Sequence, residues 1–147
     1  MSLPHRPVAG WVVQYAFLWR HEHEQRRGPA KDRPALIVAS RDWGGRIFTV
    51  VCAITTLPPV SADERDASIE IDEASKARLG LRDTRQWVRL DQVNTFVWAG
   101  YDLRHIHGRV PPTCVYGSVT PSLFEAIRLQ LLTRQRAGAV VFIDRDD

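Results

Sequence analysis

The sequence has few cysteines and no long apolar run. The two cysteines, Cys52 and Cys114, form neither a CxxC motif nor a zinc-ligand spacing, so the sequence predicts no disulfide framework and no zinc site. Cys52 lies within an apolar run and is expected to pack as a small core residue. The apolar runs are too short to cross a bilayer, and residues 1–10 contain no apolar signal region. We therefore expect a soluble cytoplasmic protein that does not enter a membrane.

Several enzyme motifs are also missing. The chain contains no GxSxG, no phosphate-binding P-loop, no GxGxxG and no HExxH. Two histidine pairs, His21 with His23 and His105 with His107, could each contribute to a metal site, but neither has a third ligand nearby in the sequence. We expect these histidines to be exposed, and we expect no metal and no cofactor.

The composition is that of an ordinary globular domain. Of the 147 residues, 44% are hydrophobic and 25% are charged, and this length is sufficient for one domain with its own core. The formal net charge is +3. Residues 20–46 carry seven basic and four acidic side chains, so the whole excess falls in the first third of the chain. Such a basic segment is compatible with a nucleic-acid partner and equally with a solvated loop.

Short segments rich in β-branched and aromatic residues predict a mainly β structure. The clearest strands are expected at 11–19, 34–39 and 47–55, and the turn sequence 42–45 predicts that the last two form a hairpin. Further short strands are expected at 68–71, 86–98, 116–119 and 139–143. The segment 63–66 is predicted to be a solvated connection, and 101–112 an irregular one.

Helix signals are concentrated late in the chain. Thr120 is a good N-cap, Pro121 suits the first helical position, and Gly138 suits the position after the helix. A shorter helix is predicted over 73–79, before Gly80. Many short strands and one late helix predict a small curved antiparallel sheet or barrel that is closed at one side by the helix.

The most informative polar residues lie at strand ends. Arg33 precedes one strand of the predicted hairpin, and Thr55 and Thr56 end the other. If these strands pair, Arg33 and Thr55 leave the sheet at the same end, where a guanidinium fork and a hydroxyl could bind a phosphate. The alternative is an arginine that pairs with a local acid such as Asp32, beside a threonine that caps a turn.

At these residues the sequence resembles the MazF/PemK family of toxin–antitoxin ribonucleases. The resembling segments occur in family order, and the strongest is the Arg-Pro strand motif over 33–38. The other resembling segments are 11–17, the pair Glu24–Gln25, 53–56, 91–98 and 119–132.

The resemblance implies a small SH3-like antiparallel β-barrel with a C-terminal α-helix, formed as one domain by 1–147 and usually homodimeric. It also implies a growth-inhibiting endoribonuclease, a hydrolase that cuts single-stranded RNA such as mRNA without a metal, by attack of the substrate 2′-hydroxyl. The catalytic arginine and threonine of the family fall on Arg33 and Thr55. The implied partner is a small acidic antitoxin that covers the RNA groove.

Further residues are candidates for RNA binding. The predicted substrate-binding residues are Glu24, Gln25, Arg26, Arg27, Lys31 and Thr56. The basic side chains among them would hold the RNA backbone, an interaction that weakens as salt rises. Trp19 or Trp43 could stack a base. Proton transfer is left open between Glu24, His21 and His23.

The chain also departs from the family pattern. The loop between the Glu-Gln pair and Arg33 is longer than usual, the segment 68–91 contains an insertion, and the stretch after Gly138 has no clear counterpart. Two other hypotheses therefore stay open. One is a non-catalytic binding protein on the same barrel, like the CcdB relatives that bind a topoisomerase. The other is an inactive family member that serves as an interaction domain.

Overall fold

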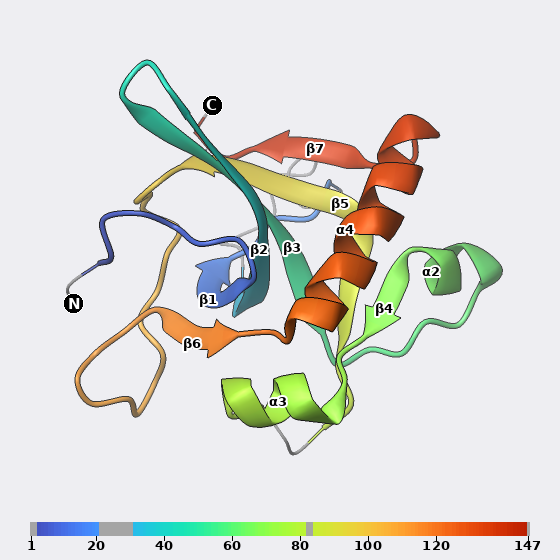
Figure 1. The fold of residues 1–147 in the computed structure, drawn as a ribbon, viewed down its shortest axis with the longest axis horizontal. Helices are drawn as coiled ribbons and strands as arrows, with labels where there is room; N and C mark the ends of the chain where they lie inside the picture. The colour runs from blue at the N-terminus through green and yellow to red at the C-terminus, as the bar shows by residue number, and fades with distance from the viewer. Residues whose placement is uncertain (1–2, 21–30, 82–83, 147) are drawn as a thin grey trace.

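A seven-stranded sheet and three helices make up the part of the chain that the computed structural model describes, which is residues 3–20, 31–81 and 84–146 (Figure 1). The strands are β1 (Trp11–Ala16), β2 (Asp32–Trp43), β3 (Arg46–Thr55), β4 (Ser68–Glu70), β5 (Trp87–Val97), β6 (Val115–Ser118) and β7 (Val141–Asp144). The helices are α2 (Ala62–Asp66), α3 (Glu73–Leu79) and α4 (Pro121–Arg136). No helix within these ranges has the length and apolar character that a membrane crossing needs.

The strands follow the order β4-β5-β3-β2-β1-β6 and pair antiparallel along this path. One edge of β5 pairs with β3. The other edge pairs with β4 near the start of β5 and with β7 nearer its end. Among the strands of the described ranges, no pairing joins this edge to β6, so the sheet is open. The mainly β fold with a C-terminal helix is confirmed, whereas the predicted closure into an SH3-like barrel is not.

The last strand, β7, differs from the prediction in its direction. β7 runs parallel to β5, with Val93 paired to Phe142, although the sequence pattern predicts an antiparallel sheet throughout. A parallel neighbour needs a long crossover connection, and α4 lies in that connection. The strand pattern alone does not contain this information, because it does not say on which side of the sheet α4 packs.

The predicted hairpin of β2 and β3 is confirmed. Gly44 and Gly45 form its turn with φ angles of 61° and 78°, the left-handed conformation that matches the twist of a two-residue hairpin. Trp43 pairs with Arg46 next to the turn. Both strands are longer than expected at this end, so the ribbon projects beyond the body of the molecule (Figure 1).

Local capping explains the helices. The Thr120 hydroxyl accepts a hydrogen bond from the Leu123 amide at 3.4 Å, and α4 ends before Gly138, whose φ is 69°, as predicted. The predicted helix over 73–79 is likewise confirmed as α3. The segment 63–66 has no buried residue, as the predicted solvated connection requires, but it forms the short helix α2, which the sequence pattern did not predict. Its N-cap is Ser61, whose hydroxyl accepts from the Glu64 amide at 3.1 Å.

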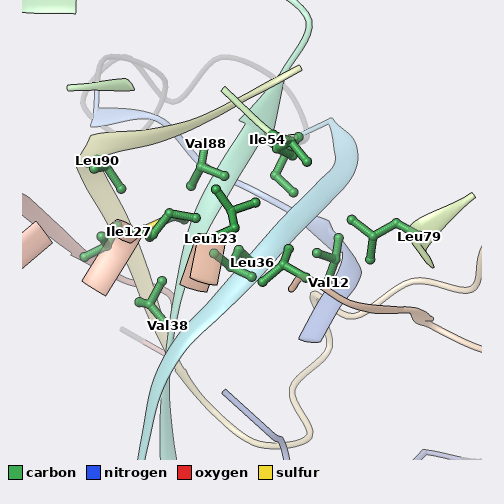
Figure 2. Close-up of a cluster of buried hydrophobic side chains, with 13 residues drawn as sticks. Val12, Leu36, Val38, Ile54, Leu79, Val88, Leu90, Leu123 and Ile127 are labelled. Carbon is green, nitrogen blue, oxygen red and sulfur yellow. The ribbon is translucent and has the colours of Figure 1, made fainter. Parts of the chain in front are cut away.

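Two hydrophobic clusters lie on opposite faces of the sheet, as strand alternation requires. One contains Leu36 and Cys52 and is covered by α4 through Leu123 and Ile127 (Figure 2). The other contains the aromatic residues Tyr15, Phe17 and Phe96. Burying each large apolar side chain contributes about 1.5–3 kcal/mol, so these clusters fix the register that positions the strand ends.

Candidate functional site

The hairpin register brings Arg33 and Thr55 together. Leu36 pairs with Cys52 and Ala35 with Ala53, and continuing this register by two residues places Arg33 opposite Thr55. Both side chains line one open cavity of about 350 Å³ at the end of the ribbon farthest from its turn. The other lining residues are Trp19, Leu57, Arg89, Asp91 and Gln92.

The guanidinium group of Arg33 lies near an aromatic ring. Its Cζ is 5.6 Å from the centroid of Trp19, a distance at which cation–π attraction operates. The neighbouring Asp32 carboxylate lies 3.6 Å from Nε of Arg104. Successive strand residues face opposite sides of a sheet, so Asp32 and Arg33 are directed to different surroundings.

Thr55 is almost buried at the end of β3, with 8% of its surface exposed. Its Oγ1 accepts a hydrogen bond from the Leu57 amide at 3.1 Å, so the hydroxyl caps the turn that follows the strand. The turn-capping alternative is therefore correct as a description of this contact. It does not compete with a role in the cavity, because a hydroxyl that accepts one bond still has its O–H to donate.

A bulge in β5 supplies the opposite wall of the cavity. Val88 pairs with Ile54 and Val93 with Cys52, so the single residue Ala53 on β3 faces the four residues 89–92 on β5. Bulges redirect side chains and are frequent next to active sites. Sequence reasoning assigned no role to Arg89, Asp91 or Gln92. Two signals could have found them: all three are polar residues within an otherwise apolar strand, and Asp91 and Gln92 begin the segment 91–98 that resembles the family.

Two guanidinium groups and one carboxylate define the electrostatics of the cavity. Arg89 binds Asp91 through two contacts, Nη2–Oδ2 at 2.8 Å and Nε–Oδ1 at 3.2 Å. The side chains of this pair are 20% and 26% exposed. The Cζ of Arg89 lies 5.8 Å from the centroid of Trp19, which therefore contacts both arginines. The cavity thus presents cationic donors, a hydroxyl and an aromatic ring, which is a combination suited to a phosphate with its attached base.

The remaining predicted site residues are not gathered there. Lys31 and Thr56 are exposed and do not line the cavity. Glu24, Gln25, Arg26 and Arg27, together with His21 and His23, lie outside the described residues. Trp43 is 71% exposed near the hairpin turn, at the other end of β2. His105 and His107 are exposed, and the described ranges contain no group of three side chains that could hold a metal.

Neither thiol is suited to nucleophilic chemistry. Burial raises the pKa of Cys52 to about 12, with a smaller contribution from the Asp91 carboxylate. Burial also raises the pKa of Cys114 above its ordinary value. Because the thiolate is the reactive form, both side chains are unreactive at neutral pH. Neither of them lines the cavity.

Comparison with known proteins places this site within a family. The family model described as PemK-like, MazF-like toxin of type II toxin–antitoxin system matches residues 12–113, which is more than half of the chain. The match begins at the second residue of β1, includes β2 to β5 and every residue that lines the cavity, and ends before β6 and α4. No curated protein matches the chain. The chain belongs to the family of PemK-like, MazF-like toxins of type II toxin–antitoxin systems.

Proposed function

We propose that the protein is a toxin that cuts single-stranded RNA, without a metal, in the cavity lined by Arg33 and Thr55. The observation that carries this proposal is the meeting of Arg33, Thr55 and Arg89 around one open cavity, although they come from three different strands. Family membership supports the same activity, and the family implies an antitoxin partner.

In the proposed reaction the substrate supplies its own nucleophile. The 2′-hydroxyl loses its proton to a base and attacks the adjacent phosphorus, and the bond from phosphorus to the 5′-oxygen breaks. The 5′-oxygen takes up a proton, so the products are a 2′,3′-cyclic phosphate and a 5′-hydroxyl end. Arg33 and Arg89 donate to the phosphate oxygens as negative charge grows on them, and Thr55 donates its O–H. Each such donor typically lowers the barrier by about 3–4 kcal/mol.

A carboxylate in the cavity widens the choice for proton transfer. Arginine stays protonated at ordinary pH and is a poor base. Of the described residues that line the cavity, Asp91 is the one carboxylate, and its contacts with Arg89 fix its position. Asp91 therefore joins Glu24, His21 and His23 as a candidate to take the proton of the 2′-hydroxyl.

The direct test uses the purified full chain and single-stranded RNA in the presence of a chelator. Cleavage should persist with the chelator. Arg33→Ala should lower the rate by about 10²–10³-fold, and Thr55→Val, which keeps the shape but removes the hydroxyl, should also lower it strongly. The matched control is Arg41→Ala, an exposed arginine farther along β2 that should leave the rate unchanged.

Unchanged cleavage by Arg33→Ala would remove this site from consideration. Intact RNA together with an inhibited topoisomerase would favour the binding-protein alternative. Harmless overexpression without RNA cleavage would favour an inactive member.

The partners follow from the same proposal. A small acidic antitoxin would complement the guanidinium groups of Arg33 and Arg89 and block the RNA from the cavity. We also expect the toxin to form a homodimer and to act in the cytoplasm. Sedimentation of the chain alone tests the homodimer. Sedimentation together with the protein encoded by the neighbouring reading frame, if that protein is small and acidic, tests the antitoxin partner.

A further inference from the structure

A second and larger cavity adjoins the proposed catalytic one. Its volume is about 530 Å³, within the range of small-molecule sites, and it shares Arg89, Asp91 and Gln92 with its neighbour. Helix α2 and the segment between α4 and β7 provide the other walls, and α2 lies beside α4 (Figure 1). A phosphate held by Arg33 and Arg89 would therefore have a ready-made space next to it for an adjoining part of the RNA.

The charges that line this second cavity disfavour a phosphate as its occupant, because carboxylates outnumber guanidinium groups four to three. The carboxylates belong to Asp63, Glu64, Asp66 and Asp91, and the guanidinium groups to Arg20, Arg89 and Arg134. Three of these carboxylates, those of Asp63, Glu64 and Asp66, belong to α2. Asp66 is already engaged by Arg134, at 2.6 Å, and by the Gln130 amide, at 3.3 Å. Carboxylates repel phosphate but accept hydrogen bonds from neutral N–H groups. The occupant should thus be an uncharged group that carries N–H donors, and next to an RNA phosphate that group is a base.

Asp63 is the carboxylate that can read such a base. It is exposed at the cavity, and among the described residues none forms an ion pair or a side-chain hydrogen bond with its carboxylate. A carboxylate accepts two parallel hydrogen bonds when the partner has two adjacent donors. Guanine presents such a pair on its Watson–Crick edge, N1–H beside the exocyclic amino group. Uracil presents a single N–H between two carbonyl oxygens, which a carboxylate repels.

We propose that this cavity binds a guanine base adjoining the cleaved phosphate, with Asp63 as the specificity-determining residue. The inference rests on the proposed RNA-cleaving function. It also assigns a role to parts of the chain that lie beyond the family match, since Arg134, Gly138, Ala139 and Val141 line the cavity and the match ends at residue 113. The cavity is thus formed jointly by the matched region, which contains Asp63, and by the segment after it.

The first experiment measures cleavage-site preference on a pool of single-stranded RNAs randomised around the cut. Guanine should be enriched at one position adjoining the cleaved link. Asp63→Asn replaces one acceptor with an N–H₂ donor, so it should lower the preference for guanine over uracil about tenfold while cleavage continues. Ala139→Phe, which fills the cavity from another wall, should lower the same preference. Asp42→Asn, an exposed carboxylate near the hairpin turn, is the matched control and should change nothing.

The second experiment does not depend on cleavage. Binding of guanosine 5′-monophosphate and of uridine 5′-monophosphate to the full chain is measured by calorimetry, for the wild type, Asp63→Asn and Asp42→Asn. Tighter binding of the guanine nucleotide that Asp63→Asn abolishes supports the inference even if no RNA is cut, in which case only the catalytic proposal fails. Cleavage without guanine enrichment, or equal binding of both nucleotides by the wild type and Asp63→Asn, overturns the inference and leaves the catalytic proposal intact.

Discussion

Two cavities of similar size differ in the side chains that line them. The polar cavity of about 350 Å³ lies at the β5 bulge, whereas an apolar cavity of about 390 Å³ lies where α4 rests on the sheet, lined mainly by Val38, Val50, Val93, Leu131, Leu132 and Phe142. Both cavities adjoin an irregularity in strand pairing, the bulge of β5 opposite Ala53 at the first and the register shift of β2 at Val38 at the second. Volume and pairing geometry therefore do not distinguish the two cavities, and the polar or apolar character of the lining side chains does.

The strongest test of a functional difference between the polar and the apolar cavity removes one arginine from each. Arg89→Gln should lower RNA cleavage by about 10²–10³-fold, because a cationic donor to the developing charge is lost. Arg128→Gln is the matched variant in the apolar cavity, since Arg128 also binds a carboxylate, Glu125, through two contacts. It should leave cleavage unchanged. Equal losses in the two variants would show that the cavities do not differ in function.

Stability, unlike cleavage, should depend mainly on the apolar side of the sheet, where α4 packs. Ile127 of α4 is fully buried against the sheet, and Ile127→Ala should lower the free energy of unfolding by about 2–4 kcal/mol through lost burial and a residual cavity. Leu129→Ala on the exposed side of the same helix is the control, because Leu129 is 52% exposed. Urea unfolding measures both. A small loss at Ile127 would mean that α4 contributes little to holding the apolar side together.

A smaller effect is expected at the start of α4. Thr120→Ala removes the hydroxyl that caps the helix and should cost about 1 kcal/mol. Thr133→Ala is the control within the same helix, since its hydroxyl only donates to the Leu129 carbonyl at 3.0 Å. If both changes have equal effects on urea unfolding, the cap does not set the position of α4 over the apolar cavity.

The smallest predicted effect is a pH dependence. The Cys52 thiol packs in the cluster beneath α4, and burial raises its pKa to about 12. An unfolded chain loses this proton near pH 8.5, so the stabilisation is complete below that pH and falls as pH rises toward 12. By about pH 9 the loss relative to neutral pH should be roughly 0.8 kcal/mol. Cys52→Ala should remove this part of the pH dependence, and an unchanged slope in urea unfolding would contradict the assignment.

The elements that local chemistry specifies were predictable. Gly44–Gly45 predicts the hairpin, and Thr120, Pro121 and Gly138 predict the limits of α4, because each residue acts on its immediate neighbours. The missed elements depend on distant partners. The direction of β7 follows from where α4 crosses the sheet, and the open edge follows from which strands find no partner among the described residues.

The site was predictable in part for the same reason. Arg33 and Thr55 lie at the same end of the hairpin, as its turn and its apolar pattern predict. Their direct opposition was not predictable, because the register of the turn, with Trp43 opposite Arg46, would place Arg33 opposite Thr56. A shift of one residue between Ile37 and Ala39 brings Thr55 there instead. Arg89, Asp91 and Gln92 enter the cavity through a bulge opposite Ala53, and no sequence pattern states where a strand will bulge. Glu24 and its neighbours remain predictions outside the described residues.

The sequence by itself determined the strands, the helices α3 and α4, the hairpin and the likeness to a toxin family, since all of these depend on residues close together in the chain or on motifs in order. Only the tertiary structure decided that Arg89 and Asp91 face Arg33, and that α2 and the segment after α4 wall a second cavity beside them. The physical reason is that such contacts arise when separate strands and helices bury their apolar faces together, and the polar side chains left at the rim meet as a consequence of that packing.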